Sequence, residues 1–451
     1  MTKINKDSRI CIIGAGPGGL STGYFLQKAG YKYVTILEKL PKIGGLCNTI
    51  TFENKSFDLG ANYLTPAYKK TLKLAKEVGA QLYSESHAYC YDPAANKYTS
   101  LFKQATEKTT VWKFLWQSLK YFYKRWKASK HLPEAGFGGV VQHAELTCTF
   151  DQWLVDKKLT ALRELFKVPI TLMGYGELDE IPAPYALTYM SNPTFFSLIW
   201  FGSGLPSIWP KRFIHGFQRF WQQISWNLTV ITSVDIQEIK REENIKIRFK
   251  VSEHKMNELV HSEKKMEFDH LIVAVPLTLK IMKDLFTNKS TNECTLTKEE
   301  EYLFSKVKTN PFCMTTFILE DTHLPHPLVN IMPVPEIGDV FIVTQQFEGN
   351  PFVSFYSRTK TEDDPGKDEV IEKVRYLYRL MGSKYKGEYY THDRWTYFPH
   401  VSVNMFKEGF YDRLEEMQGN NKTYFTGGLM AFELIEPIIN YSDNLVNKYF
   451  L

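Results

Sequence analysis

The chain has 451 residues, of which 43% are hydrophobic, 15% aromatic and 23% charged, and its formal net charge is +5. This length exceeds what one hydrophobic core usually supports, so we expect two substructures, and the mild charge without a dense basic run argues against nucleic acid as a partner. The six cysteines are scattered without a C-x-x-C pair, which favours reduced thiols and neither a disulfide framework nor a metal site.

The N-terminal segment is polar and leads directly into an apolar run, Arg9–Ile13. It leaves no room for a signal peptide, and no apolar stretch in the chain reaches the roughly 18 residues that a membrane span requires. We therefore expect a cytoplasmic protein.

A glycine-rich turn follows this apolar run, and a helical pattern follows the turn. Gly14, Gly16 and Gly19 have the spacing of a dinucleotide-binding turn. The first glycine allows the tight turn, the second lets the backbone approach a pyrophosphate, and the third lets the helix pack on the strand. The phosphates would lie at the helix N-terminus, together with Pro17 and Gly18.

A second predicted strand, residues 34–37, ends in Glu38, which is followed by Lys39. An acid about 20 residues past the glycine turn accepts hydrogen bonds from a ribose diol, and it favours an unphosphorylated ribose. Strand, turn, helix, strand and acid together predict a Rossmann-type domain in an α/β fold.

Two further glycine segments come next, at residues 42–46 and 57–62. With them the chain resembles the flavin-containing amine oxidase and polyene desaturase superfamily. The resemblance implies FAD as a non-covalent cofactor, and relatives carry a basic residue where Leu46 stands, so one phosphate contact is absent. It places these residues at the cofactor: Gly44, Gly45, Leu46, Gly60, Ala61 and Asn62.

Two later segments complete the pattern of a discontinuous FAD domain. Residues 226–231 and 234–240 are predicted strands of a small sheet covering the adenine, and 268–276 is a predicted buried strand. We expect Val234 and Val275 at the cofactor.

The third segment is C-terminal. Residues 423–426 are a predicted strand that enters a turn at Gly427 and Gly428, followed by a helix that would direct its N-terminus at the cofactor. In relatives an acid commonly occupies the position of Gly428 and binds the ribityl hydroxyls.

We expect the FAD domain to comprise residues 1–92, 215–276 and 401–451, and an interleaved α+β substrate domain to comprise 93–214 and 277–400. Within the latter, region 109–130 places aromatic residues at helical spacing between lysines. The favoured interpretation is a helix whose aromatic stripe packs on the domain core; contact with a membrane surface is the alternative.

At finer grain the chain resembles the bacterial polyunsaturated fatty acid double-bond isomerases, through residues 174–176, 181–187, 395–402 and 416–419. The resemblance implies double-bond movement by internal hydride transfer through flavin N5, with a hydrophobic small molecule, a fatty acid, as substrate. It suggests Tyr397 and Phe398 as catalytic contacts and Tyr175 and Tyr185 as pocket wall. It also suggests His87 and Tyr89 as candidates for contacting the substrate carboxylate.

One departure argues against amine oxidation. Amine oxidases usually carry a lysine beside flavin N5, and its place falls here on Cys313 or Met314. Two alternatives stay open: a flavin oxidase or desaturase acting on an amine or polyene, and a non-catalytic flavin-binding interaction protein. The oligomeric state is also open.

Overall fold

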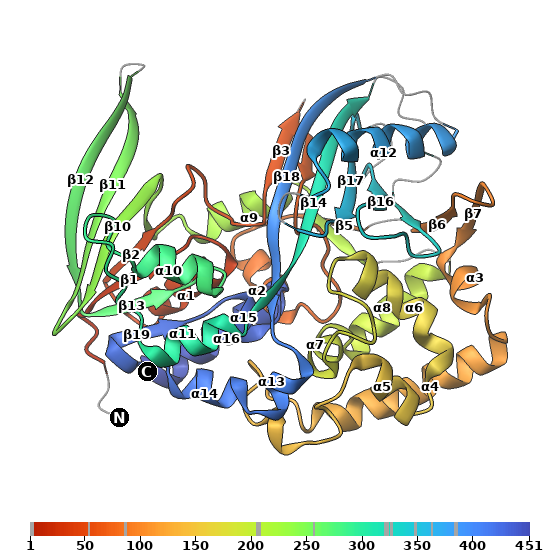
Figure 1. The fold of residues 1–451 in the computed structure, drawn as a ribbon, viewed down its shortest axis with the longest axis horizontal. Helices are drawn as coiled ribbons and strands as arrows, with labels where there is room; N and C mark the ends of the chain where they lie inside the picture. Colours follow the sequence, from red (N-terminus) through yellow and green to blue (C-terminus); the bar gives the residue numbers. More distant parts are fainter. Residues whose placement is uncertain are drawn as a thin grey trace.

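The computed structural model describes residues 4–52, 55–84, 88–203, 209–255, 258–319, 324, 328–346, 350–361, 364–382 and 387–451. Figure 1 shows the predicted dinucleotide-binding half on the left and a helical region at the lower right. The long strands β14 (Lys308–Leu319) and β18 (Gly387–His400) rise at the centre. Among the helices within the described ranges, none is long and apolar enough to cross a membrane.

A parallel sheet of five strands lies at the centre of the dinucleotide half, in the order β19-β13-β1-β2-β9. Its three inner strands are largely buried because both faces are covered, as parallel sheets require. The strands are β1 (Arg9–Ile13), β2 (Tyr33–Leu37), β9 (Thr229–Ile231), β13 (His270–Val273) and β19 (Thr423–Phe425). The predicted strands at β1, β2, β13 and β19 are therefore confirmed.

Helices surround this sheet and cover its faces (Figure 1). They are α1 (Pro17–Lys28), α2 (Lys69–Glu77), α9 (Gly216–Ile224), α10 (Leu279–Phe286), α11 (Lys298–Ser305), α13 (Val403–Lys407), α14 (Phe410–Glu416), α15 (Gly428–Ala431) and α16 (Ile435–Tyr449). The single C-terminal helix predicted after Gly428 is wrong: Phe432 has a φ of 84°, so the chain breaks between α15 and α16.

A second sheet is antiparallel and consists of β10 (Val234–Arg241), β11 (Ile245–Lys255) and β12 (Glu258–Phe268). The prediction that residues 226–231 belong to this small sheet is wrong. β9 instead pairs in parallel with β2, with Val230 opposite Ile36. Its short apolar run forms the edge strand of the Rossmann sheet. Strand propensity predicts that this run is a strand, but it does not predict which sheet the strand joins.

The third sheet has seven strands and belongs to the predicted substrate half, in the order β18-β14-β17-β16-β15-β6-β7. Helix α12 (Lys367–Leu380) covers one face, where Val370, Val374 and Tyr378 pack against Val353 and Phe355. The strands are β6 (Tyr89–Asp92), β7 (Lys97–Ser100), β14 (Lys308–Leu319), β15 (Leu328–Ile331), β16 (Val340–Thr344), β17 (Phe352–Arg358) and β18 (Gly387–His400).

Two short antiparallel pairs complete the strands: β3 (Thr49–Phe52) with β4 (Lys55–Asp58), and β5 (Leu82–Ser84) with β8 (Lys211–Phe213). Helices α10 and α11 contact the dinucleotide half: Arg241 of β10 forms an ion pair with Glu300 of α11 at 2.5 Å. The exact domain boundaries stay predictions.

The helical region comprises α3 (Leu101–Thr106), α4 (Val111–Ser129), α5 (Phe150–Asp156), α6 (Arg163–Lys167), α7 (Ala183–Tyr189) and α8 (Asn192–Gly202). The predicted helix in region 109–130 is confirmed as α4, but the interpretation that its aromatic stripe packs on the core is wrong. The buried face carries Phe114, Tyr121 and Arg125, whereas Trp112 is 83% exposed and Trp116 68%.

Candidate cofactor and active site

The glycine turn after β1 has the geometry predicted for it. Gly14 has a φ of 102°, a conformation that L side chains rarely adopt. A Cβ atom at Gly19 would lie 1.9 Å from the carbonyl oxygen of Gly14, so only glycine lets α1 pack on the strand at this position. Gly16 is the N-cap of α1 and supplies no side-chain cap, which leaves the amide groups of the first turn available to an anion.

Glu38 lies against this turn. Its Oε2 atom accepts a hydrogen bond of 2.6 Å from the Ala15 amide, and its Oε1 atom accepts one of 2.8 Å from the Leu40 amide. The backbone amide of Val234 donates to the carbonyl of Glu38 at 2.9 Å, and the adjacent Lys39 is exposed. Each carboxylate oxygen has a second lone pair, so the side chain retains capacity for a ribose hydroxyl.

The second glycine segment lies directly along the first. The Gly44 amide donates to the Ala15 carbonyl at 2.8 Å, and a Cβ atom on Gly45 would lie 3.1 Å from the Cα atom of Gly16. A Cβ atom on Gly60 would lie 1.7 Å from the carbonyl oxygen of Leu46, so this segment also needs glycine for a close backbone approach. Ala61 and Asn62 follow it and are partly exposed.

The C-terminal turn at Gly427 and Gly428 packs against the N-terminal glycine turn. A Cβ atom on Gly18 would lie 3.2 Å from the Cα atom of Gly427, and Ser442 of α16 donates to the Gly18 carbonyl at 3.2 Å. Val275 reaches the other side of the turn, where its Cγ1 atom would lie 3.2 Å from a Cβ on Gly14. Three segments distant in sequence therefore form one backbone-lined cradle, which fits a dinucleotide diphosphate.

Glu433 is a residue of this cradle that the sequence reasoning missed. A Cβ atom on Gly428 would lie 2.0 Å from Oε2 of Glu433, so the carboxylate occupies the space in which a side chain at 428 would begin. Desolvation raises the pKa of Glu433 from its ordinary value of 4.5 to about 7. Among the described residues, no group donates a hydrogen bond to this carboxylate. Relatives commonly carry an acid at position 428, and its absence here was the sequence signal that could have directed attention to a nearby acid.

The predicted aromatic residues meet beside Glu433. The Tyr175 ring lies 5.4 Å from Tyr397, 5.1 Å from Phe398 and 4.9 Å from Phe432, and its hydroxyl donates to the Glu433 carbonyl at 3.2 Å. Burial raises the pKa values of Tyr175 and Tyr397 well above the usual range, so both phenols are neutral.

The individual roles within this aromatic cluster differ. Tyr397 is partly exposed, but Phe398 is fully buried and stacks on His400 at 4.5 Å. The Tyr185 hydroxyl shares a 2.5 Å hydrogen bond with Tyr411 and accepts one from the Val401 amide at 3.1 Å. Tyr185 and Phe398 are therefore buried members of the cluster that pack against each other in the core.

Of the two candidates for contacting a carboxylate, His87 lies outside the described residues, and Tyr89 is not part of this cluster. Tyr89 lies on β6, near the opposite end of the seven-stranded sheet from β18, which carries Tyr397. Its carbonyl accepts a hydrogen bond from Asn330 at 3.3 Å.

Two buried charged residues were also missed. Arg212 is only 1% exposed; its Nη2 atom donates to the Tyr63 hydroxyl at 2.6 Å, and its guanidinium stacks over the Tyr63 ring at 4.1 Å. Burial raises the pKa of Asp58 to about 6, although Thr49 and the Phe217 amide donate to it. Within the described part of the chain, no cluster of His, Cys, Asp and Glu could hold a metal ion.

Comparison with known proteins identifies residues 12–78 as an NAD(P)-binding Rossmann-like domain. A polyenoic fatty acid isomerase of Ptilota filicina is 27% identical over 205 residues, and the match covers 41% of this chain and 41% of that protein. The chain thus matches well under two thirds of the algal enzyme.

Two solved structures share the fold over nearly the whole chain. A fatty acid isomerase from P. acnes that produces conjugated linoleic acid superposes with a TM-score of 0.82 and 24% identity, covering 99% of this chain and 100% of that one. Putrescine oxidase superposes with a TM-score of 0.68 and 16% identity, covering 98% of each chain. The predicted resemblance is therefore confirmed: the chain has the α/β fold shared by these isomerases and amine oxidases, with a Rossmann-like domain at its N-terminal end.

Proposed function

We propose that the protein is an FAD-dependent isomerase that moves a double bond in a polyunsaturated fatty acid or acyl chain. The observation that carries the proposal is the convergence of three glycine segments, around Gly16, Gly45 and Gly427, beside a cluster of neutral aromatic side chains. The first feature suits a dinucleotide, and the second suits an apolar substrate next to it.

FAD fits the cradle better than a nicotinamide cofactor. The Rossmann turn and Glu38 would hold the ADP half, as in any dinucleotide site. The segment at Gly44–Gly45 lies along Gly16, and Gly427–Gly428 continues the cradle to Glu433, whose backbone carbonyl accepts a hydrogen bond from Tyr175. We infer non-covalent binding, so unfolding in urea should release free FAD.

When bound, FAD would supply hydride acceptance and return at N5, which requires no external electron acceptor. The residues of the chain would position the acyl chain and exclude water. The faces of aromatic rings attract developing positive charge, and the cluster supplies those of Tyr175, Tyr397 and Phe432. Tyr397 is the aromatic residue best placed to contact cofactor or substrate, because it is partly exposed.

The algal and bacterial relatives named for fatty acid isomerisation support the substrate class. Tyr89 is remote from Tyr397 in the sheet order, so it does not supply a carboxylate contact at the aromatic cluster.

A flavin oxidase is the second candidate, because the fold also matches putrescine oxidase. The strand β14 argues against it. Cys313 and Met314 are both fully buried, and neither can take the place of the lysine expected in an amine oxidase. Release of peroxide with an amine or polyene would favour the oxidase.

Anaerobic incubation of the purified yellow protein with linoleic acid tests the proposal. We expect ultraviolet absorbance of a conjugated diene to accumulate without net flavin reduction. Absence of such a product from several polyenes would reject the isomerase. Bound flavin that shows neither transient reduction nor product formation with any candidate substrate would indicate a non-catalytic flavin protein instead.

A further inference from the structure

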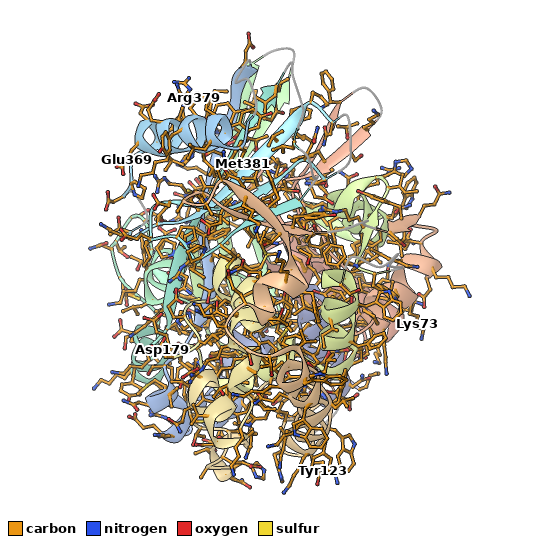
Figure 2. The ribbon with its side chains drawn as sticks, turned by 90° about the vertical axis from the view of Figure 1, so that its right-hand side faces the viewer. Lys73, Tyr123, Asp179, Glu369, Arg379 and Met381 are labelled. Carbon is orange, nitrogen blue, oxygen red and sulfur yellow. The ribbon has the colours of Figure 1, made fainter. Side chains whose placement is uncertain are left out.

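The outward side of helix α4 carries a continuous apolar surface. We define the aromatic face of α4 as seven exposed residues: Val111, Trp112, Leu115, Trp116, Leu119, Tyr123 and Trp126. At 100° per residue these positions fall within an arc of about 140°, opposite the buried face. Figure 2 shows Tyr123 at the outer edge of the molecule.

Lysines flank this face. Lys113, Lys127 and Lys130 are exposed, and Lys120 and Lys124 are partly exposed. The sequence has no aspartate or glutamate between Lys108 and Pro133. Lys130 lies over the Trp126 ring at 4.1 Å, which leaves its ammonium group at the border of the apolar surface.

A helix of this kind would be costly to leave in water, and its composition selects one class of partner. Tryptophan and tyrosine rings prefer the boundary between lipid headgroups and acyl chains, and lysines beside them attract anionic headgroups. A protein partner would have to supply a large apolar surface ringed by acids. We propose that the aromatic face of α4 docks in plane onto an anionic lipid surface.

Vesicle co-sedimentation tests this proposal. We expect the whole protein to bind vesicles of equal parts phosphatidylglycerol and phosphatidylcholine more tightly than vesicles of phosphatidylcholine alone, and less tightly as salt rises. The double variant W112S/W116S should lower the vesicle partition coefficient at least about tenfold, and K113E/K127E at least about fivefold for each lysine. Trp226 is 79% exposed in the other half of the molecule, so W226S is a matched control that should bind like the parent.

Three results would overturn the proposal. They are absence of vesicle binding by the parent protein, binding by W112S/W116S as tight as by the parent, and a dimer in sedimentation velocity that W112S/W116S converts to monomer. The last would assign the face to a second copy of this chain. Unchanged melting temperatures would show that the variants are folded.

A second inference concerns Glu433 and rests on the proposed binding of FAD. A partly buried carboxylate without a donor is unfavourable unless a ligand supplies one. The carboxylate lies against Gly428, next to the Gly427–Gly18 contact, and the Tyr175 ring cluster begins at the backbone of the same residue. We infer that Glu433 accepts hydrogen bonds from hydroxyl groups of the ribityl chain, between the diphosphate cradle and the ring.

Titration of FAD into the apoprotein separates this role from catalysis. We expect E433A to weaken FAD at least about tenfold and E433Q to weaken it less, while the exposed-site control E416Q binds normally. G428E alone should disrupt the turn, because its side chain would meet Oε2 of Glu433. The exchange variant G428E/E433G should recover FAD affinity to within about threefold of the parent.

The outcomes distinguish the two claims. If the parent protein takes up no FAD, the proposed function fails. If the parent binds FAD and E433A and E433Q bind it within twofold, only the role of Glu433 fails. Should E433A not fold, E433Q and the exchange variant decide the question.

Discussion

The two glycine turns of the cradle differ in what makes glycine necessary. At the N-terminal turn, the obstacle to a side chain at Gly19 is the Gly14 carbonyl, only five residues away. At the C-terminal turn, the obstacle at Gly428 is the carboxylate of Glu433, a side chain that could itself be different. The first turn is constrained by backbone geometry and the second by a choice of residue. Gly19 should therefore tolerate no side chain, whereas Gly428 should tolerate a compensated substitution.

The largest effect is expected at Gly19. In G19A the new Cβ atom would lie 1.9 Å from a backbone oxygen, so α1 must move away from β1. We expect a loss of roughly 3 kcal/mol or more in the free energy of unfolding, together with loss of FAD. Urea denaturation and the visible spectrum measure both. The control G138A places its Cβ atom 3.5 Å from the nearest atom and should be close to neutral; equal effects in both variants would refute the backbone argument.

The second largest effect is expected at Glu38, whose side chain joins the N-terminal turn to the end of β2. E38A would leave the amides of Ala15 and Leu40 without their acceptor. We expect about 2 kcal/mol of destabilisation and about a hundredfold weaker FAD binding, and E38Q should lie between the variant and the parent. Melting temperature and FAD titration check this. Normal FAD affinity in E38A would show that the carboxylate serves the turn alone.

The third prediction concerns Glu433 at the C-terminal turn and the pH dependence of the free energy of unfolding. Its folded pKa, about 7, lies above its ordinary 4.5. Its burial therefore costs nothing below about pH 4.5, and stability is lost as the pH rises through 7. In the apoprotein, E433Q should be more stable than the parent by about 1–2 kcal/mol at pH 8, with the difference vanishing near pH 4.5. Urea midpoints at several pH values measure this, and a gain independent of pH would contradict it.

The smallest effect is expected at Tyr397. Y397L should slow isomerisation about fivefold, because it removes a partly exposed ring face, and should change FAD affinity less than twofold, because the glycine cradle is untouched. The contrasting variant is Y185F, which loses hydrogen bonds to Tyr411 and Val401 and should lower stability rather than the rate. Rates and melting temperatures of the pair test the assignment. A Y185F protein that is slow but fully stable would reverse it.

The aromatic residues show where sequence reasoning was insufficient. Tyr175, Tyr185, Tyr397 and Phe398 lie together in the structure, and the roles expected for them stay predictions. Their separate roles depend on which ring is exposed, and no periodicity reports that. On α4 the same limit led to a wrong interpretation: apolar and aromatic residues populate both faces of the helix, so its pattern does not reveal which face meets the core.

Local sequence alone determined the Rossmann turn, the acid after β2 and the neighbouring strands β1 and β2, because these features depend on backbone contacts within a few dozen residues. Long-range packing determined the sheet to which β9 belongs, the exposure of Trp112 and Trp116, and the approach of Glu433 to Gly428. These three features depend on which apolar surfaces become covered and on where the break at Phe432 redirects the chain. Distant segments compete for the same contacts, so the local sequence does not determine the result.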